Sequence, residues 1–281
     1  MGTGSIAFLG AVAGFTIFLG LPAARVRRLS TAARAALNAG AVGVLLFLFW
    51  DVLAHAVEPV ESALVAARDG SGGWSRFGWL ASVLVIGFGA GLLVLVRYDG
   101  WVASRRSRRY GPGAMAADEP VLLTREPALT PARQLALLIA VGIGLHNFSE
   151  GLAIGQSAAA GETSLALLLV VGFALHNATE GFGITAPLAG EPDRPGWGFL
   201  AVLGLVGGGP TLLGTVLGRS FVDDTVYLAF LALAAGSILY VVLQLLRVAE
   251  RLGCRTVLYW GLLAGLFAGF ATDFVLVAAG G

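Results

Sequence analysis

The chain has 281 residues, of which 57% are hydrophobic and 12% are charged, and its formal net charge is +1. A soluble globular domain carries about 25% charged residues, so this composition excludes a water-soluble enzyme or binding domain. The near-neutral charge implies no nucleic-acid partner, and the single cysteine, Cys254, excludes an intrachain disulfide and a CxxC metal site.

Long apolar stretches follow one another along the chain, separated by charged and turn residues. A helix needs about 20 mostly apolar residues to cross a bilayer. We expect spanning helices at 4–24, 35–57, 77–97, 134–157, 163–187, 197–218, 225–246 and 257–279. The longest loop, 98–133, is rich in Arg, Pro and Gly, and we expect it to be mobile. The sequence therefore predicts an all-α membrane protein with eight transmembrane helices, and residues 1–281 form a single transmembrane domain in the lipid bilayer.

The basic residues are unevenly distributed between the two sides of the membrane. All 18 are arginine, and with eight spans 15 fall on one side and 3 on the other. Loops rich in arginine stay in the cytoplasm, which predicts a cytoplasmic loop 98–133 and both termini outside. The bias toward alanine, glycine and arginine, without lysine, is typical of bacterial high-GC genomes and indicates a multi-pass protein of the cell membrane.

One motif occurs twice inside the predicted spans. HNFSEG (146–151) in the fourth span recurs as HNATEG (176–181) in the fifth. His146 and Glu150 are four residues apart, so one helix face presents both, and Asn147 flanks that face. The second copy supplies His176, Asn177 and Glu180. The two spans run in opposite directions, so the repeat is typical of the inverted pairs found in transporters.

These residue types suit a divalent metal ion. Two imidazole nitrogens and two carboxylates from facing helices favour zinc, and also iron, manganese, cobalt or cadmium. Two carboxylates neutralise a divalent cation, which lowers the cost of carrying it through hydrocarbon. Helix association through hydrogen bonds is the other reading of a single motif, but two copies in adjacent spans at matched depth favour metal binding.

Other ionisable residues also fall inside predicted spans. Asp51 and His55 lie in the outer part of the second span, and Glu58 follows on the same face. Asp273 lies in the outer part of the eighth span. Asp51, His55 and Asp273 are candidates for a route by which cations enter, and an interhelical polar cluster is the open alternative.

At these residues the chain resembles the ZIP (Zrt/Irt-like) family of metal transporters. The resemblance rests first on His146-Asn147-x-x-Glu150-Gly151 and then on His176-x-x-x-Glu180. Weaker matches are Gly208-x-Pro210, Ala235-Gly236-Ser237-x-x-Tyr240 and the glycine-rich eighth span. It implies a 3+2+3 helix arrangement with inverted repeats and metal movement into the cytoplasm, by an elevator-like shift of one helix bundle against the other. The transported metal is then the substrate, with no organic cofactor, and both monomer and homodimer stay open.

The sequence departs from the family in three places. Many members carry an acid directly after the first histidine of the fifth-span motif, where this chain has Asn177. Some members add a sixth-span glutamate that completes a two-metal site, and this sixth span contains no acid. The loop 98–133 contains no histidine, so the His-rich metal buffer of many members is missing. One main metal site is therefore favoured.

Two other functions remain open at this point. Three intramembrane histidines with an aspartate are compatible with a zinc-dependent intramembrane hydrolase, although the chain has no HExxH motif. The other alternative is a structural or receptor-like membrane protein that holds no metal.

Overall fold

The computed structural model describes residues 2–26, 30–109, 129–161, 163–220 and 223–278. The side chains of residues 102–109 and of several single positions, including His176, lie outside this description. The described residues form helices and connecting turns, with no strand among them. The α-helices are α1 (Thr3–Phe15), α2 (Thr31–Arg68), α3 (Trp74–Arg109), α4 (Pro131–Ala159), α5 (Thr163–Thr185), α6 (Trp197–Gly218), α7 (Asp224–Arg251) and α8 (Arg255–Ala278). Short 3-10 helices follow α1 and α5, namely η1 (Thr16–Leu19), η2 (Leu21–Arg25) and η4 (Ala186–Gly190).

The apolar helices confirm a multi-pass all-α membrane protein. Seven helical stretches in the described part of the chain are long and apolar enough to cross a membrane. They are Thr3–Arg25, Thr31–Arg68, Trp74–Trp101, Pro131–Ala159, Trp197–Gly218, Thr225–Arg251 and Arg255–Val275. The predicted span 163–187 is helical as α5 but is not among these seven. The count of eight spans therefore stays a prediction.

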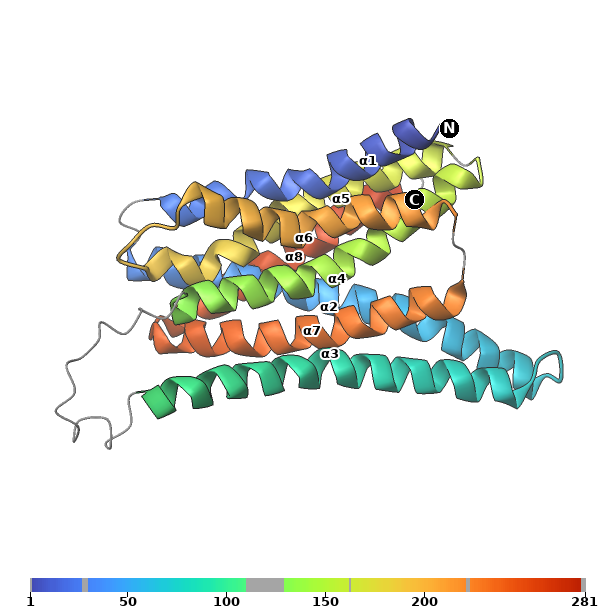
Figure 1. Cartoon of the computed structure of the whole chain (residues 1–281), viewed down its shortest axis with the longest axis horizontal. Helices are drawn as coiled ribbons and strands as arrows, with labels where there is room; N and C mark the ends of the chain where they lie inside the picture. The colour runs from blue at the N-terminus through green and yellow to red at the C-terminus, as the bar shows by residue number, and fades with distance from the viewer. Residues whose placement is uncertain (1, 27–29, 110–128, 162, 221–222, 279–281) are drawn as a thin grey trace.

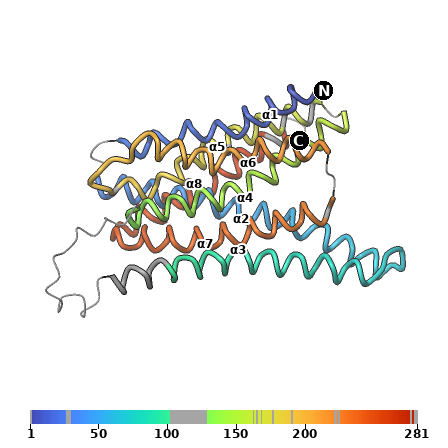
Figure 2. Tube along the Cα trace, in the orientation of Figure 1, coloured from blue at the N-terminus to red at the C-terminus, as the bar shows by residue number. Residues whose placement is uncertain are grey.

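Two helices run well past their predicted ends. α2 begins after Ser30, whose hydroxyl accepts from the amide of Ala33 at 3.1 Å, and continues through Pro59 to Arg68. α3 continues to Arg109, so the predicted loop 98–133 begins as helix (Figure 1). The Cα trace in Figure 2 shows α3 lying alongside α7. Alanine and arginine favour helix in water as well as in lipid, so the helix outlasts the apolar stretch. The rest of that loop, 110–128, lies outside the described residues.

The helices form two groups of four. α4 packs on α6, α1 packs on α6 and α5, and these four helices make the first group (Figure 1). α2 packs on α8 and α7, α3 packs on α7, and these four make the second group. The groups meet where α4 contacts α7 and where α5 contacts α2 and α8. The doubled motif lies on α4 and α5, so both copies belong to the first group.

Glycines allow very close backbone approach inside each group. In the first group Gly151 of α4 lies against the main chain of Thr211, and Gly214 of α6 lies against the carbonyl of Phe148. In the second group Gly43 of α2 lies against the main chain of α8, and Gly265 of α8 against that of α2. A Cβ atom at these positions would overlap main-chain atoms, which no side-chain rotation relieves. Small residues serve the same purpose in membrane helix pairs generally.

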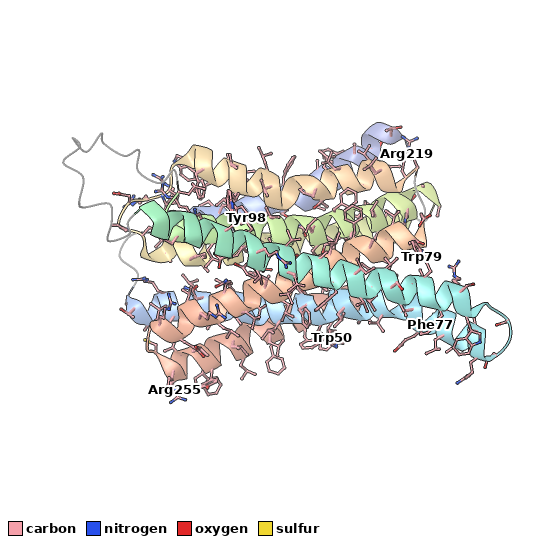
Figure 3. The ribbon with its side chains drawn as sticks, turned by 60° about the horizontal axis from the view of Figure 1, so that its bottom comes forward. Trp50, Phe77, Trp79, Tyr98, Arg219 and Arg255 are labelled. Carbon is pink, nitrogen blue, oxygen red and sulfur yellow. The ribbon has the colours of Figure 1, made fainter. Side chains whose placement is uncertain are left out.

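The arginine-rich segments meet at one end of the helices. Arg25 of η2 donates to the carbonyl of Pro195 at 2.5 Å, and its guanidinium stacks on Trp197. Nε of Arg133 at the start of α4 lies 2.9 Å from a carboxylate oxygen of Glu191. Arg255 also lies at this end, whereas Arg219 lies at the opposite end, where α1 starts (Figure 3). The arrangement agrees with the arginine asymmetry in the sequence.

Candidate metal site

The first copy of the motif lies in the middle of α4, which begins with Thr130 as N-cap and Pro131 in the first turn. His146 and Glu150 are one turn apart, and Nε2 of His146 lies 3.2 Å from Oε1 of Glu150. The residues are 4% and 6% exposed. Gly144 and Gly151 on the same helix bring α6 close, which seals this part of α4 from lipid.

The second copy meets the first through Asn147. Its Nδ2 lies 2.5 Å from Oδ1 of Asn177 and 3.0 Å from Oε2 of Glu180, both on α5. The same nitrogen also donates to the carbonyl of Gly207 on α6 at 3.0 Å. Asn177 in turn donates to the carbonyl of Ala13, near the end of α1, at 3.1 Å. Four helices therefore converge on one polar cluster, and Asn147, Asn177 and Glu180 are at most 1% exposed.

Several buried oxygens in this cluster have no hydrogen-bond partner. They are Oδ1 of Asn147, Oε2 of Glu150, Oε1 of Glu180 and Oγ1 of Thr211. Buried polar atoms in native proteins are nearly always paired, so unpaired acceptors need an explanation. Carboxylate, amide and hydroxyl oxygens beside an imidazole form a donor set that suits a divalent cation. The residues present therefore fit a metal ion as substrate.

A deep cavity of about 380 Å³ reaches the α4 half of the cluster. His146 and Glu150 lie on its wall, together with Asp51, His55 and Asp273. Its other lining residues are Phe47, Val52, Ser149, Ala153, Leu169, Phe173, Tyr227, Leu231 and Val277. The three residues that the sequence offers as an access route thus share one cavity with two of the six proposed metal ligands.

The position of His176 is described only by its backbone. It lies on α5 one helical turn before Glu180, and its side chain is outside the described set. Among the side chains that are described, no group of three or more His, Cys, Asp or Glu residues is arranged to hold a metal. A complete site from the predicted ligands therefore depends on where the His176 imidazole lies.

Sequence reasoning missed some members of the cluster. The carbonyls of Gly207 and Ala13 carry no sequence signal, because every residue has one. Gly207 does lie in the Gly-Gly-Gly-Pro segment, 207–210, of α6. Pro210 has no amide proton for the helix, yet α6 runs unbroken from Trp197 to Gly218. Thr211 follows this proline, and its hydroxyl is fully buried without a hydrogen-bond partner.

Comparison with known protein families assigns the chain to one of them. The sequence profile described as ZIP zinc transporter matches residues 120–276, which is more than half of the chain. The chain belongs to the ZIP zinc transporter family. The matched region contains α4 to α7, most of α8 and both copies of the motif. No curated protein matches the chain at a significant level.

Membership in the ZIP family decides between the alternatives left open by the sequence. ZIP proteins are transporters of divalent metal ions and not enzymes, so this chain transports divalent metal and the hydrolase alternative is set aside. Several apolar helices agree with a protein that crosses the membrane repeatedly. The receptor-like alternative without metal is set aside for the same reason.

Proposed function

We propose that this chain carries a divalent metal ion, zinc before iron, manganese, cobalt or cadmium, from outside the cell into the cytoplasm. The transport site consists of His146, Asn147 and Glu150 of α4 with His176, Asn177 and Glu180 of α5. The observation that carries this proposal is the contact of Asn147 with both Asn177 and Glu180, which joins the two copies of the motif. The unpaired carboxylate oxygens of Glu150 and Glu180 are available to the ion.

The residues that line the deep cavity support the proposed direction of transport. His55 and Asp51, which line this cavity, lie in the half of α2 that leads to the α2–α3 turn. Among the described residues, Arg68 and Arg76 are the only basic residues around that turn. Arginine-poor loops lie outside the cell, so the cavity faces outward and both termini lie on the same side. An ion that enters from there reaches His146 and Glu150 without passing the arginine-rich end.

The two helix groups supply the moving parts for an elevator-like shift. The site residues belong to the first group, whereas Asp51, His55 and Asp273 belong to the second. Inside each group glycines hold main chains together, but between groups a Cβ at Gly142 would meet Ser237 at 3.5 Å, an ordinary contact. Close backbone packing inside each group and ordinary contacts between the groups favour sliding of one group against the other. Such sliding carries the loaded site inward. Along the chain, α4 and α5 lie between a first and a last set of three helices, and this 3+2+3 arrangement is part of the same proposal.

Metal binding by the purified protein tests the proposed site. Equilibrium dialysis with zinc compares the wild type with Glu150→Gln and Glu180→Gln, and with Glu61→Gln as control. Glu61 is an exposed acid of α2 that does not line the deep cavity. We expect each site variant to lose one tightly held zinc and the control to keep it. Equal zinc content in all four proteins would contradict the proposed site.

A further inference from the structure

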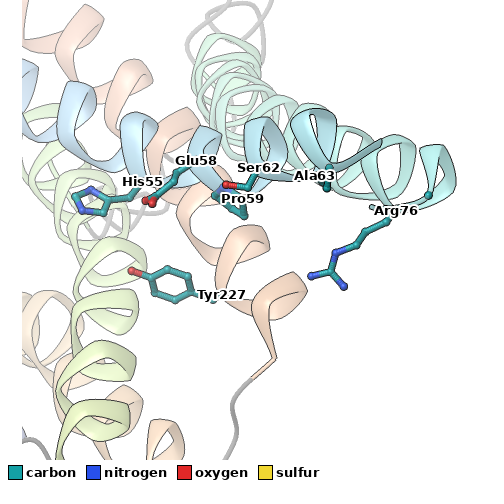
Figure 4. A pocket seen from close by; sticks show the side chains of 10 residues that line it. His55, Glu58, Pro59, Ser62, Ala63, Arg76 and Tyr227 are labelled. Carbon is teal, nitrogen blue, oxygen red and sulfur yellow. The ribbon is translucent and has the colours of Figure 1, made fainter. Parts of the chain in front are cut away.

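A second cavity, which we call the outer cavity, adjoins the deep one. It has a volume of about 460 Å³ and lies between α2, the start of α3 and the start of α7 (Figure 4). His55 and Tyr227 line both cavities, so they mark the junction between them. The outer cavity also contains Glu58, which lies beside His55 on α2, and Arg76, which lies on the far side from both (Figure 4).

The imidazole of His55 is oriented as in a metal ligand. Its Nδ1 lies 2.9 Å from the main-chain carbonyl of Asp51, one turn earlier in the same helix. A carbonyl only accepts, so Nδ1 donates to it, and in the neutral imidazole Nε2 then keeps its lone pair. Histidines that bind metal commonly donate their other ring N–H in this way, because it fixes the ring and its tautomer. The side chain is 56% exposed and lines both cavities, which gives an ion access to it.

Two oxygens accompany this nitrogen. Glu58 is three residues after His55, so its carboxylate lies on the same helix face. Pro59 lies inside α2 and has no amide proton, so the main-chain carbonyl of His55 loses its usual helical partner four residues on. An imidazole nitrogen, a carboxylate and a freed carbonyl thus come from one turn of α2, at the wall of the outer cavity.

We propose that His55 and Glu58 form an outer binding station, where a divalent metal ion binds before it moves to the site on α4 and α5. This rests on the proposed transport function. The ligands are Nε2 of His55, the Glu58 carboxylate and the His55 carbonyl, and water fills the other positions. So few protein ligands give a weak, rapidly exchanging site, which suits loading rather than storage.

Carboxylates line the route from this station to the transport site. Asp51 lies one turn before His55 on the same face of α2 and lines the deep cavity. Asp273 of α8 lines it as well, and Glu150 lies on the same cavity wall. An ion that leaves the station therefore meets carboxylates of the second helix group before those of the first.

Zinc uptake into proteoliposomes separates loading from translocation. The variants are His55→Gln and Glu58→Gln, with Glu61→Gln as matched control. Loss of one ligand should raise KM for zinc about tenfold, the equivalent of about 1.4 kcal/mol, while the maximal rate stays within about twofold. The control should match the wild type. Unchanged KM in both variants, or a collapse of the maximal rate in both, would overturn the proposed station.

A binding measurement keeps this inference distinct from the transport proposal. In Glu180→Gln protein the transport site is disabled, and zinc titration should still report one weak site. Adding His55→Gln should remove that site, and adding Glu61→Gln should leave it. If no weak site is present in Glu180→Gln protein, the station does not exist, whatever the wild type transports. If the site is present but the wild type carries no zinc, the transport proposal fails and the station stands.

Discussion

The side-chain amide of Asn147 on α4 lies 3.0 Å from the carboxylate of Glu180 on α5, and this contact ties the two copies of the motif together. Both residues are almost completely buried, in a region where water cannot replace a lost partner. The amide therefore fixes the carboxylate in place while the other oxygen of Glu180 stays available. If the proposed site is correct, a change at this one contact affects both metal binding and stability.

Replacing Asn147 by alanine tests that coupling. The change removes the donor to Asn177, Glu180 and the carbonyl of Gly207, and each buried acceptor left unpaired costs about 1–3 kcal/mol. We expect a clearly lower thermal midpoint in detergent and a strong loss of zinc uptake. Thr185→Val is the control, because the buried Thr185 hydroxyl bonds to carbonyls of its own helix. A variant as stable as the control would mean that the Asn147 contacts are incidental.

The close approach of α4 and α6 predicts opposite effects for two glycine substitutions. A Cβ at Gly151 would overlap the main chain of Thr211, and such overpacking costs about 1–3 kcal/mol. Gly89 of α3 has open space around it, so alanine there gains helix propensity, about 1 kcal/mol at most. Thermal unfolding in detergent should show Gly151→Ala below the wild type and Gly89→Ala at or above it. Equal midpoints would contradict the close packing of α4 on α6.

A disulfide across the boundary between the helix groups tests whether they move. A Cβ at Gly142 would lie 3.6 Å from Cβ of Ser237, which is within the range of a disulfide. In a Cys254→Ser background, Gly142→Cys with Ser237→Cys should form the bond on oxidation and stop zinc uptake. Reduction should restore uptake, and each single cysteine should leave it largely intact. Full uptake by the oxidised double variant would exclude sliding between α4 and α7.

The native cysteine reports the topology. Cys254 lies in the turn between α7 and α8, at the arginine-rich end, so we expect it in the cytoplasm. Ser71 lies exposed in the turn between α2 and α3, at the other end. A membrane-impermeant maleimide applied to intact cells should label Ser71→Cys in a Cys254→Ser background and should not label wild-type Cys254. The reverse pattern would invert the proposed orientation and, with it, the direction of transport.

The sequence predicted the helices well because hydropathy marks where a helix must satisfy its own backbone in lipid. It did not predict where α2 and α3 end, since Glu58 to Arg68 and Tyr98 to Arg109 contain charged residues and are still helical. Hydropathy indicates which residues lie in the apolar layer of the membrane. Where a helix continues into water, its end depends on other features, such as a capping residue or a glycine. Gly70, with a φ of 75°, is one such end, just after α2.

Only the part of the candidate site that consists of side chains could be predicted from the sequence. His146, Asn147 and Glu150 could be found because the motif recurs 30 residues later, in a span where polar residues are rare. Asp51, His55 and Asp273 line the cavity that reaches two of these residues, in agreement with the proposed access route. The carbonyls of Gly207 and Ala13 could not be found, because their role depends on how α1 and α6 approach α4 and α5.

Zinc uptake into proteoliposomes by the wild type, His176→Ala and Glu180→Ala tests the central claim most directly. The account predicts metal-dependent flux in the wild type that collapses in both variants, since each removes a ligand from the site that carries the ion. A variant that still unfolds cooperatively in detergent shows that the loss is not one of folding. Undiminished flux in both variants would contradict the account, because the ion would then cross the membrane without the doubled motif.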